Sequence, residues 1–189
     1  MTVQDDITAL RQAARQRNAD EAQFLLKRLL PELEFVLALG LAAEQTYRFV
    51  DTFEANHPGE VWARRMILQI VNTATAPERT IIEQAFQHFT TPGTANFIKA
   101  MYDLFEATQK TNASAARIGY LTSAIVNAMT AELVDLYFAP RPDVWTAYRS
   151  QGENFNQIAV NFWTDEAVAE RDTALWLRLA DEIEKKLAR

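Results

Sequence analysis

The amino-acid sequence predicts an all-α protein that folds as one multi-helix, bundle-like domain over residues 1–189. Along most of the chain, apolar residues recur at intervals of three or four, which is the spacing of one helix face. The apolar-polar alternation that marks β-strands is nowhere convincing. Only 5 of the 189 residues are glycine, and no Pro-, Gly- or Ser-rich linker separates two halves. We therefore expect about eight or nine helices, with short loops joining antiparallel neighbours.

The first part of the chain is expected to hold an N-terminal helix over about residues 5–18 and a second helix from Asp20. Pro31 should kink or restart the second helix, because proline removes a backbone N–H and clashes with the preceding turn. The restarted helix is expected to run to about Ala55. It contains the most apolar run, residues 35–43, which is less than half of the roughly 20 residues that a transmembrane helix needs. We interpret this run as a buried helix.

Two helices are expected after the Pro-Gly pair at residues 58–59. The first should point six residues inward: Val61, Trp62, Met66, Ile67, Ile70 and Val71. The second is short and should bury four: Ile82, Ala85, Phe86 and Phe89.

The next two helices are predicted over residues 94–110 and 113–138. The second of them carries an apolar stripe with steps of three or four: Ile118, Leu121, Ile125, Met129, Leu133 and Leu136. Its opposite face carries Ala124, Ala128 and Ala131, whose small side chains allow another helix to approach closely. We expect this helix to be central, with neighbours on two sides.

Pro92 after Thr91 and Pro142 after Arg141 show the pattern of a proline in the first turn of a helix, where its missing N–H costs nothing, so helices are expected to begin there. After Pro142, Gly152 predicts either one kinked helix or two short ones. The last helix should start at Thr164 as N-cap and end in a basic segment that suits the helix dipole. Its predicted core stripe has six residues: Val168, Leu175, Trp176, Leu179, Ile183 and Leu187.

Composition excludes several classes of protein. With 49% hydrophobic and 23% charged residues, the chain does not resemble a disordered protein. There is no cysteine, which removes disulfides, thiolate metal sites and cysteine nucleophiles. The N-terminus has no apolar stretch of the kind found in signal peptides. We expect a soluble, cytoplasmic protein.

The charge distribution predicts neither a nucleic-acid partner nor a membrane partner. The formal net charge is −6, which repels polyanions and anionic lipid surfaces. The densest basic residues include Arg11, Arg15, Lys27 and Arg28, but acids such as Asp20 are interleaved with them. We interpret these segments as solvated helix faces.

A helical repeat array is a minor alternative. Pro-Gly pairs at residues 58–59 and 92–93 are 34 residues apart, which is the period of tetratricopeptide arrays. The Leu-Gly pair at residues 39–40, however, has Val36 and Ala43 where that pattern requires Trp and Tyr. Because stacked arrays need at least three units and only fragments are found, a bundle is the preferred interpretation.

The sharpest candidate for chemistry is the series Asp51, Glu54 and His57 near one helix end, where a spacing of three places all three residues on roughly one face. Glu54 and His57 form a Glu-x-x-His unit, of which di-metal bundles use two together with further carboxylates. The other histidine, His88, has no Glu three residues before it, and nothing in the sequence brings Glu132 or Asp135 near His57. We interpret His57 as a helix-end residue and keep metal binding as a hypothesis.

Other cofactors and catalytic groups find little support. His88 lies between Phe86 and Phe89 and is a candidate haem ligand, but core packing explains these aromatics equally well. Glycine-rich phosphate loops and the surroundings of a serine nucleophile are absent from the sequence. Tyr120 and Asn127 share the less apolar side of the central helix, and they mark a place where a pocket could form. We assign no catalytic residue, metal ligand or cofactor.

Three functional hypotheses remain. The first is a non-enzymatic interaction or scaffold protein, acting as a homodimer or as an adapter to another protein, because many apolar helices leave faces to share. The second is a module that holds a small apolar ligand in an enclosed cavity of roughly several hundred Å³ between helices. The third is a carboxylate and histidine metal-binding bundle, which needs at least three further ligands around Glu54 and His57.

Overall fold

The computed structural model describes residues 2–73, 82, 84–85 and 90–188, and these residues form helices and turns without a strand among them. The predicted all-α fold class is confirmed. The elements in chain order are α1 (Val3–Arg15), α2 (Ala19–Leu29), the 3₁₀ helix η1 (Leu30–Glu32), α3 (Phe35–Tyr47), α4 (Val50–Asn56), α5 (Trp62–Thr73), α7 (Thr94–Thr108), α8 (Ser114–Phe138), α9 (Pro142–Arg149), α10 (Phe155–Thr164) and α11 (Glu166–Leu187).

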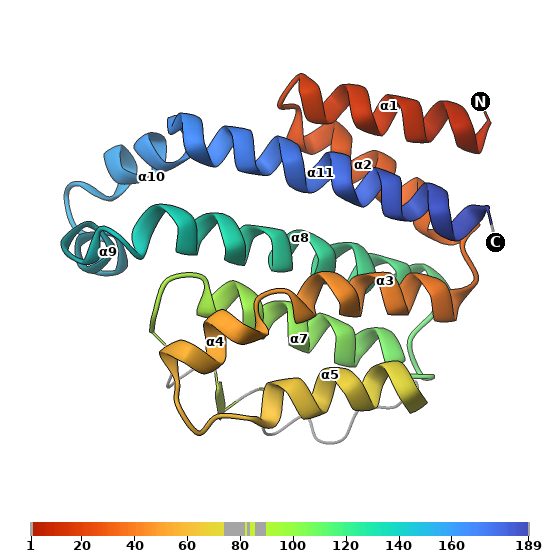
Figure 1. Cartoon of the computed structure of the whole chain (residues 1–189), viewed down its shortest axis with the longest axis horizontal. Helices are drawn as coiled ribbons and strands as arrows, with labels where there is room; N and C mark the ends of the chain where they lie inside the picture. The colour runs from red at the N-terminus through yellow and green to blue at the C-terminus, as the bar shows by residue number, and fades with distance from the viewer. Residues whose placement is uncertain (1, 74–81, 83, 86–89, 189) are drawn as a thin grey trace.

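The two longest helices, α8 and α11, run side by side along the molecule (Figure 1). On one side, α1 packs against α11, and α2 packs against α1 and α8. On the other side, α3 and α7 pack against α8, and α5 lies at the outer edge against α3 and α7. The helices α9 and α10 close one end of the bundle, whereas α1 begins and α11 ends at the opposite end (Figure 1).

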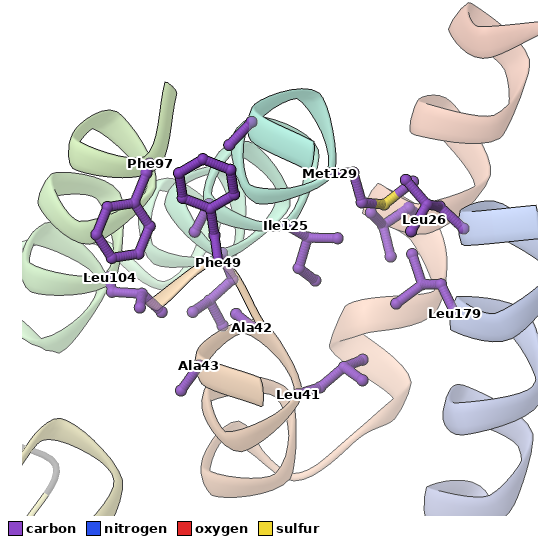
Figure 2. Packing of buried hydrophobic residues seen from close by; sticks show 14 of the residues in the cluster. Leu26, Leu41, Ala42, Ala43, Phe49, Phe97, Leu104, Ile125, Met129 and Leu179 are labelled. Atoms are coloured by element: carbon purple, nitrogen blue, oxygen red, sulfur yellow. The ribbon is translucent and has the colours of Figure 1, made fainter. Parts of the chain in front are cut away.

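The central position of α8 explains why it is apolar on two faces. Met129 lies toward Leu26 of α2 and Leu179 of α11, while Phe49 and Phe97 lie on the other side of the helix (Figure 2). The small residues of α8 that were expected to allow close approach are at most 1% exposed: Ala124, Ala128 and Ala131. The prediction that this helix has neighbours on two sides is confirmed.

Gly93 makes the close contact between the start of α7 and α8 possible. Its φ of +77° is a conformation that side chains disfavour. A Cβ atom at this position would lie 2.4 Å from the backbone oxygen of Ala131 and 2.6 Å from a ring carbon of Phe49. Because the chain turns at Gly93, α7 begins at Thr94 and not at the proline two residues earlier.

Several apolar residues that were expected in the core are exposed. Leu136 is 42% exposed, since it lines an open groove between α8, α11 and the turn from α3 to α4. Val61, directly before the edge helix α5, and Val71 within it are each 45% exposed; among the described helices, α5 packs mainly on α3 and α7. Val36, in the run interpreted as buried, is 63% exposed in the first turn of α3. Each residue lies at a helix end or at the edge of the bundle.

Helix boundaries follow local hydrogen bonding. The helix expected to continue to Ala55 breaks into α3 and α4, because Arg48 and Phe49 donate their backbone N–H groups three residues back in a tight turn. Two short helices, and not one kinked helix, follow Pro142. The N-cap of α11 is Asp165, whose carboxylate accepts from the backbone N–H of Val168 at 3.2 Å. The predicted cap was one residue too early.

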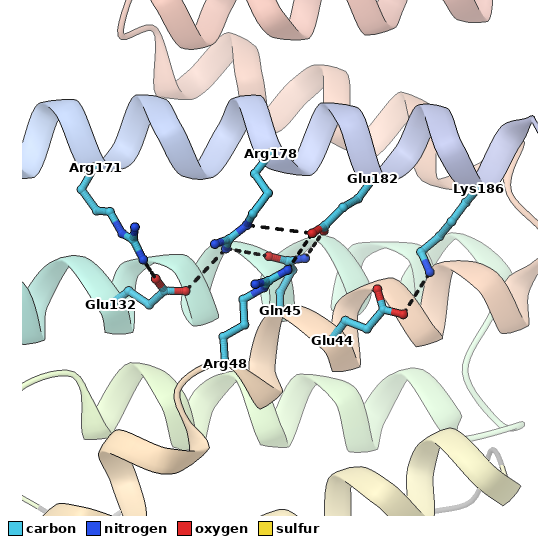
Figure 3. A network of polar contacts seen from close by, with 8 residues as sticks. All are labelled: Glu44, Gln45, Arg48, Glu132, Arg171, Arg178, Glu182 and Lys186. Atoms are coloured by element: carbon cyan, nitrogen blue, oxygen red, sulfur yellow. Dashed lines mark hydrogen bonds and ion pairs between the residues drawn. The ribbon is translucent and has the colours of Figure 1, made fainter.

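A row of charged and amide side chains joins α11 to α3 and α8 (Figure 3). We call the following eight residues the polar seam: Glu44, Gln45, Arg48, Glu132, Arg171, Arg178, Glu182 and Lys186. Glu132 is 2.6 Å from Arg171. Glu182 accepts from Gln45 at 2.5 Å and from Arg48 at 2.6 Å. These bonds fix the position of α11 along the bundle.

None of the helices in the part of the chain that the structure describes combines the length and the apolar character that a membrane crossing needs.

Candidate functional site: the groove between α2 and α8

The structure separates the three residues of the predicted metal motif. Arg64 of α5 holds both carboxylates, with its guanidinium 2.7 Å from Asp51 and 2.7 Å from Glu54. These bonds hold the pKa of Glu54 below its usual range. The imidazole of His57 lies instead 3.1 Å from the hydroxyl of Thr91. Arg64 is only ten residues from Glu54, and a search of the next helix for a cation could have found it.

His57 ends its helix as expected. Its backbone N–H donates to the carbonyl of Phe53, and its ring packs on the Phe53 ring with centroids 5.1 Å apart. Burial lowers the pKa of the imidazole. Among the residues that the structure describes, no group of three or more His, Asp or Glu side chains is arranged to hold a metal ion. The convergence that the metal hypothesis requires is missing there.

The other residues considered as metal or haem ligands are Glu132, Asp135 and His88. Glu132 belongs to the polar seam, where Arg171 engages it, and burial raises the pKa of Asp135 on the same helix. His88, the candidate haem ligand, lies outside the described residues, as do Phe86 and Phe89 of the expected short helix. Ile82 and Ala85 of that helix are buried.

Asn127 takes part in a polar cluster between α7 and α8. The carboxylate of Asp103, which is fully buried, forms an ion pair with Lys99 and accepts from the Ser123 hydroxyl at 2.6 Å. Asn127 donates to the Ser123 backbone oxygen at 2.9 Å. Tyr120 is half-buried on the same side of α8 and packs against the core. This side of α8 is partly exposed, as the sequence suggested, and its polar groups hold α7 in place.

A groove of about 310 Å³ lies beside this cluster, between α2 and α8. Its floor is α8, with Gly119, Thr122 and Ser123. Its wall is one exposed face of α2: Asp20, Gln23, Phe24 and Lys27. The floor residues are small, and the bond from Ser123 to Asp103 fixes the orientation of one of them.

Phe24 is the exposed apolar group of this groove. Its side chain is 54% exposed, because the buried stripe of α2 consists of residues on the adjoining face. The guanidinium of Arg28 lies 5.8 Å from the centre of its ring, and Arg28 in turn pairs with the buried Asp6 at 2.9 Å. The ring therefore makes a cation–π contact with Arg28 although it faces solvent.

The charges beside Phe24 have no ion-pair partner in the part of the chain that the structure describes. Asp20 and Lys27 lie on either side of Phe24 along α2, and no ion pair among the described residues involves either of them. Asp20 suits the start of the helix dipole and Lys27 suits its end. In the sequence, Phe24 is an aromatic residue outside the apolar stripe of its helix, and this signal could have located the site.

Comparison of the chain with family models, with curated proteins and with solved structures gave no match. Its function is therefore inferred from its own geometry.

Proposed function

We propose that this chain is a non-enzymatic interaction protein that works as a homodimer, with the groove between α2 and α8 as the interface. The observation that supports the proposal most strongly is the self-complementary surface of α2. The exposed side chain of Phe24 lies next to the groove, whose floor consists of small residues. Asp20 and Lys27, which have opposite charges, flank Phe24 at similar spacings along α2.

The spacing of the charges suits a two-fold axis. Asp20 and Lys27 are seven residues apart, which is about 10.5 Å along a helix. The midpoint of this segment falls between Gln23 and Phe24. An axis through the midpoint makes the two copies of α2 antiparallel, so that Asp20 of each copy faces Lys27 of the partner subunit. A two-fold interface requires this kind of pairing, because the same patch is used on both sides.

The same two-fold axis would place Phe24 in the groove of the partner subunit. The ring of each copy would enter the groove of the other, over Gly119 of the partner subunit, where no side chain blocks it. The ring would thereby lose its contact with water, and its contact with Arg28 favours one orientation before binding. Aromatic anchors that enter a pocket dominate the affinity of many interfaces.

This surface is favoured over the exposed apolar residues in and directly before α5, which are Val61, Leu68 and Val71. The α5 residues lie on a helix that leads directly into residues 74–81, outside the described part of the chain. All residues that line the α2 groove are described, and their charges are self-complementary.

The alternative of a small apolar ligand has weaker support. The hollow of about 440 Å³ between α3 and α5 and the groove beside α2 have volumes of the expected size. Both are open to solvent, whereas an enclosed cavity is needed to bury most of a ligand. This alternative stays a prediction.

Charge exchange tests the proposal. We expect the wild-type chain to be a dimer by native mass spectrometry and by sedimentation equilibrium. Asp20→Lys and Lys27→Asp should each raise the dissociation constant roughly tenfold, because each places two like-charge pairs in the dimer. The double variant D20K/K27D restores both pairs with their signs exchanged and should recover the wild-type constant.

Removal of the anchor provides a second test. Phe24→Ser deletes two anchors per dimer, each worth about 2 kcal/mol, and should raise the dissociation constant roughly a thousandfold. Val36→Ser, at an equally exposed position in α3, is the matched control and should leave it unchanged. A monomeric wild type, a dimer that tolerates Phe24→Ser, or a double charge variant that stays dissociated would overturn the proposal.

A further inference from the structure

A second hollow opens where the α2 groove ends, and Gln23 lines both. Four helices contribute to it, and its lining residues are Ala19, Gln23, Val126, Met129, Thr130, Leu133, Trp163, Asp172 and Trp176. It is smaller and more enclosed than the groove, with a volume of about 80 Å³. This is the volume of between two and three water molecules in the liquid, at about 30 Å³ each.

Two tryptophans and one carboxylate give this hollow its chemical character. Trp176 of α11 is 4% exposed and belongs to the core, whereas Trp163 of α10 is 59% exposed at the rim. Asp172 of α11 contributes the acid. The remaining walls are mostly aliphatic, and Met129 and Leu133 are both buried.

The carboxylate of Asp172 has no cation beside it among the described residues. The half-buried or buried acids Asp103, Glu132 and Glu182 pair with Lys or Arg, whereas half-buried Asp135, like Asp172, forms no ion pair within the described part of the chain. No ion pair among the described residues includes Asp172. Burial raises the pKa of this carboxyl, and a hydrogen bond from the Trp176 indole opposes the shift only in part. A cation in the hollow would compensate for the lost solvation of the carboxylate.

We propose that this hollow binds the head group of an alkylammonium ion, with its charge against Asp172 and its carbon groups against Trp163 and Trp176. Indole rings attract cations through their negative faces, and the attraction grows when water is excluded. A neutral apolar ligand would leave the carboxylate unpaired, and an anion would be repelled. The volume admits an ammonium group with small substituents but not a ring, since a benzene-binding cavity has about 150 Å³.

Methylammonium and tetramethylammonium chloride are the probes for the free ion, with sodium chloride at equal ionic strength as reference. Binding is followed by NMR through the indole N–H signals, and Trp176→Phe and Trp163→Phe assign the relevant two of the four tryptophans. We expect saturable shifts of the Trp163 and Trp176 signals. Sodium chloride should produce none.

Asp172→Asn is the decisive variant. It keeps the shape of the side chain and removes its charge, so binding of the ammonium probes should weaken about tenfold or more. Asp143→Asn, on an exposed position of α9, is the matched control and should bind like the wild type. Unchanged circular dichroism and melting behaviour of both variants separates loss of binding from loss of folding.

The ammonium group could belong to a free amine or to a lysine side chain of another protein. Nα-acetyl-lysine methylamide tests the second source. Tighter binding of this compound than of methylammonium assigns the site to lysine side chains, and the reverse assigns it to free amines. Absence of saturable shifts with all three probes, or equal affinity in Asp172→Asn, overturns the inference. The same titrations are performed on the wild type and on Asp20→Lys, the variant that should weaken the dimer. Binding of the ammonium probes is thereby tested whether or not the chain dimerises.

Discussion

Charged residues serve different purposes in the polar seam and in the α2 groove. In the seam, each of the eight residues bonds to another member, and the pairs join α11 to α3 and α8 (Figure 3). In the groove, Asp20 and Lys27 have no ion pair among the described residues, and Phe24 between them is 54% exposed. The residues of the seam pair with one another within one chain, whereas the groove offers the same kinds of groups to a partner.

The difference predicts separable consequences of mutation. Residues of the seam should determine the free energy of unfolding and leave association unchanged. Residues of the groove should determine association and leave the stability of the single subunit unchanged. Substitutions in the polar seam and in the α2 groove can confirm or contradict this difference.

The largest effect on stability is expected for Glu182→Ala. The side chain of Glu182 is 19% exposed and accepts from Gln45 and Arg48, so its removal leaves partly buried donors unpaired. We expect a loss of about 2–3 kcal/mol of unfolding free energy and a fall in Tm of roughly 8 °C. Urea and thermal unfolding followed by circular dichroism measure both quantities.

The matched control for this variant is Glu170→Ala, an exposed acid on the same helix. It should change the unfolding free energy by less than about 0.5 kcal/mol. If Glu182→Ala changed the unfolding free energy equally little, the seam would contribute little to stability, and the contrast with the groove would disappear.

The sequence predicted the helices better than the contacts between them. The apolar stripe and the terminal charges of α11 lie within one helix, and 3.6-residue periodicity was enough to find them. The seam joins Glu182 to Arg48, which is 134 residues away, so predicting it requires the order of helices in space. Exposed apolar residues such as Leu136 were misplaced for the same reason.

Part of the candidate groove could be predicted from the sequence. Asp20, Phe24 and Lys27 share one face of α2, and Phe24 lies outside the buried stripe of that helix, which periodicity alone could have shown. The floor residues Gly119 and Ser123 could not be assigned to the same groove, because they lie about a hundred residues further along the chain. A surface composed of two distant helices appears only when the bundle is assembled.

A smaller and pH-dependent effect is expected for Arg64→Ala, because Arg64 pairs the two exposed or half-exposed acids Asp51 and Glu54. The hydrogen bonds from Arg64 lower the pKa of Glu54 below its usual 4.5. The stabilisation from this pair is therefore fully present above pH 4.5, the value of the unfolded chain, and is lost as the pH falls through the lower value of the folded protein.

Urea unfolding of the wild type and of Arg64→Ala over a series of pH values measures this effect. The difference between the two proteins should be largest near neutral pH, smaller there than the effect of Glu182→Ala, and should shrink below pH 4.5. Arg65→Ala, the exposed neighbour on α5, should show no such dependence. A constant difference at all pH values would mean that Arg64 stabilises the protein by packing on Tyr47 and not by pairing with Glu54.

The smallest effect on subunit stability is expected in the groove itself. At high dilution, Lys27→Asp should unfold within about 0.5 kcal/mol of the wild type, since Lys27 is exposed and unpaired within the described chain. As protein concentration rises, the unfolding midpoint of the wild type should rise by mass action, because a dimer unfolds to two chains, and this rise should be weaker in the variant. A variant that is destabilised at high dilution as strongly as Glu182→Ala would show that Lys27 stabilises the fold of its own subunit. The groove would then contribute to the stability of the single chain and would not be an interface.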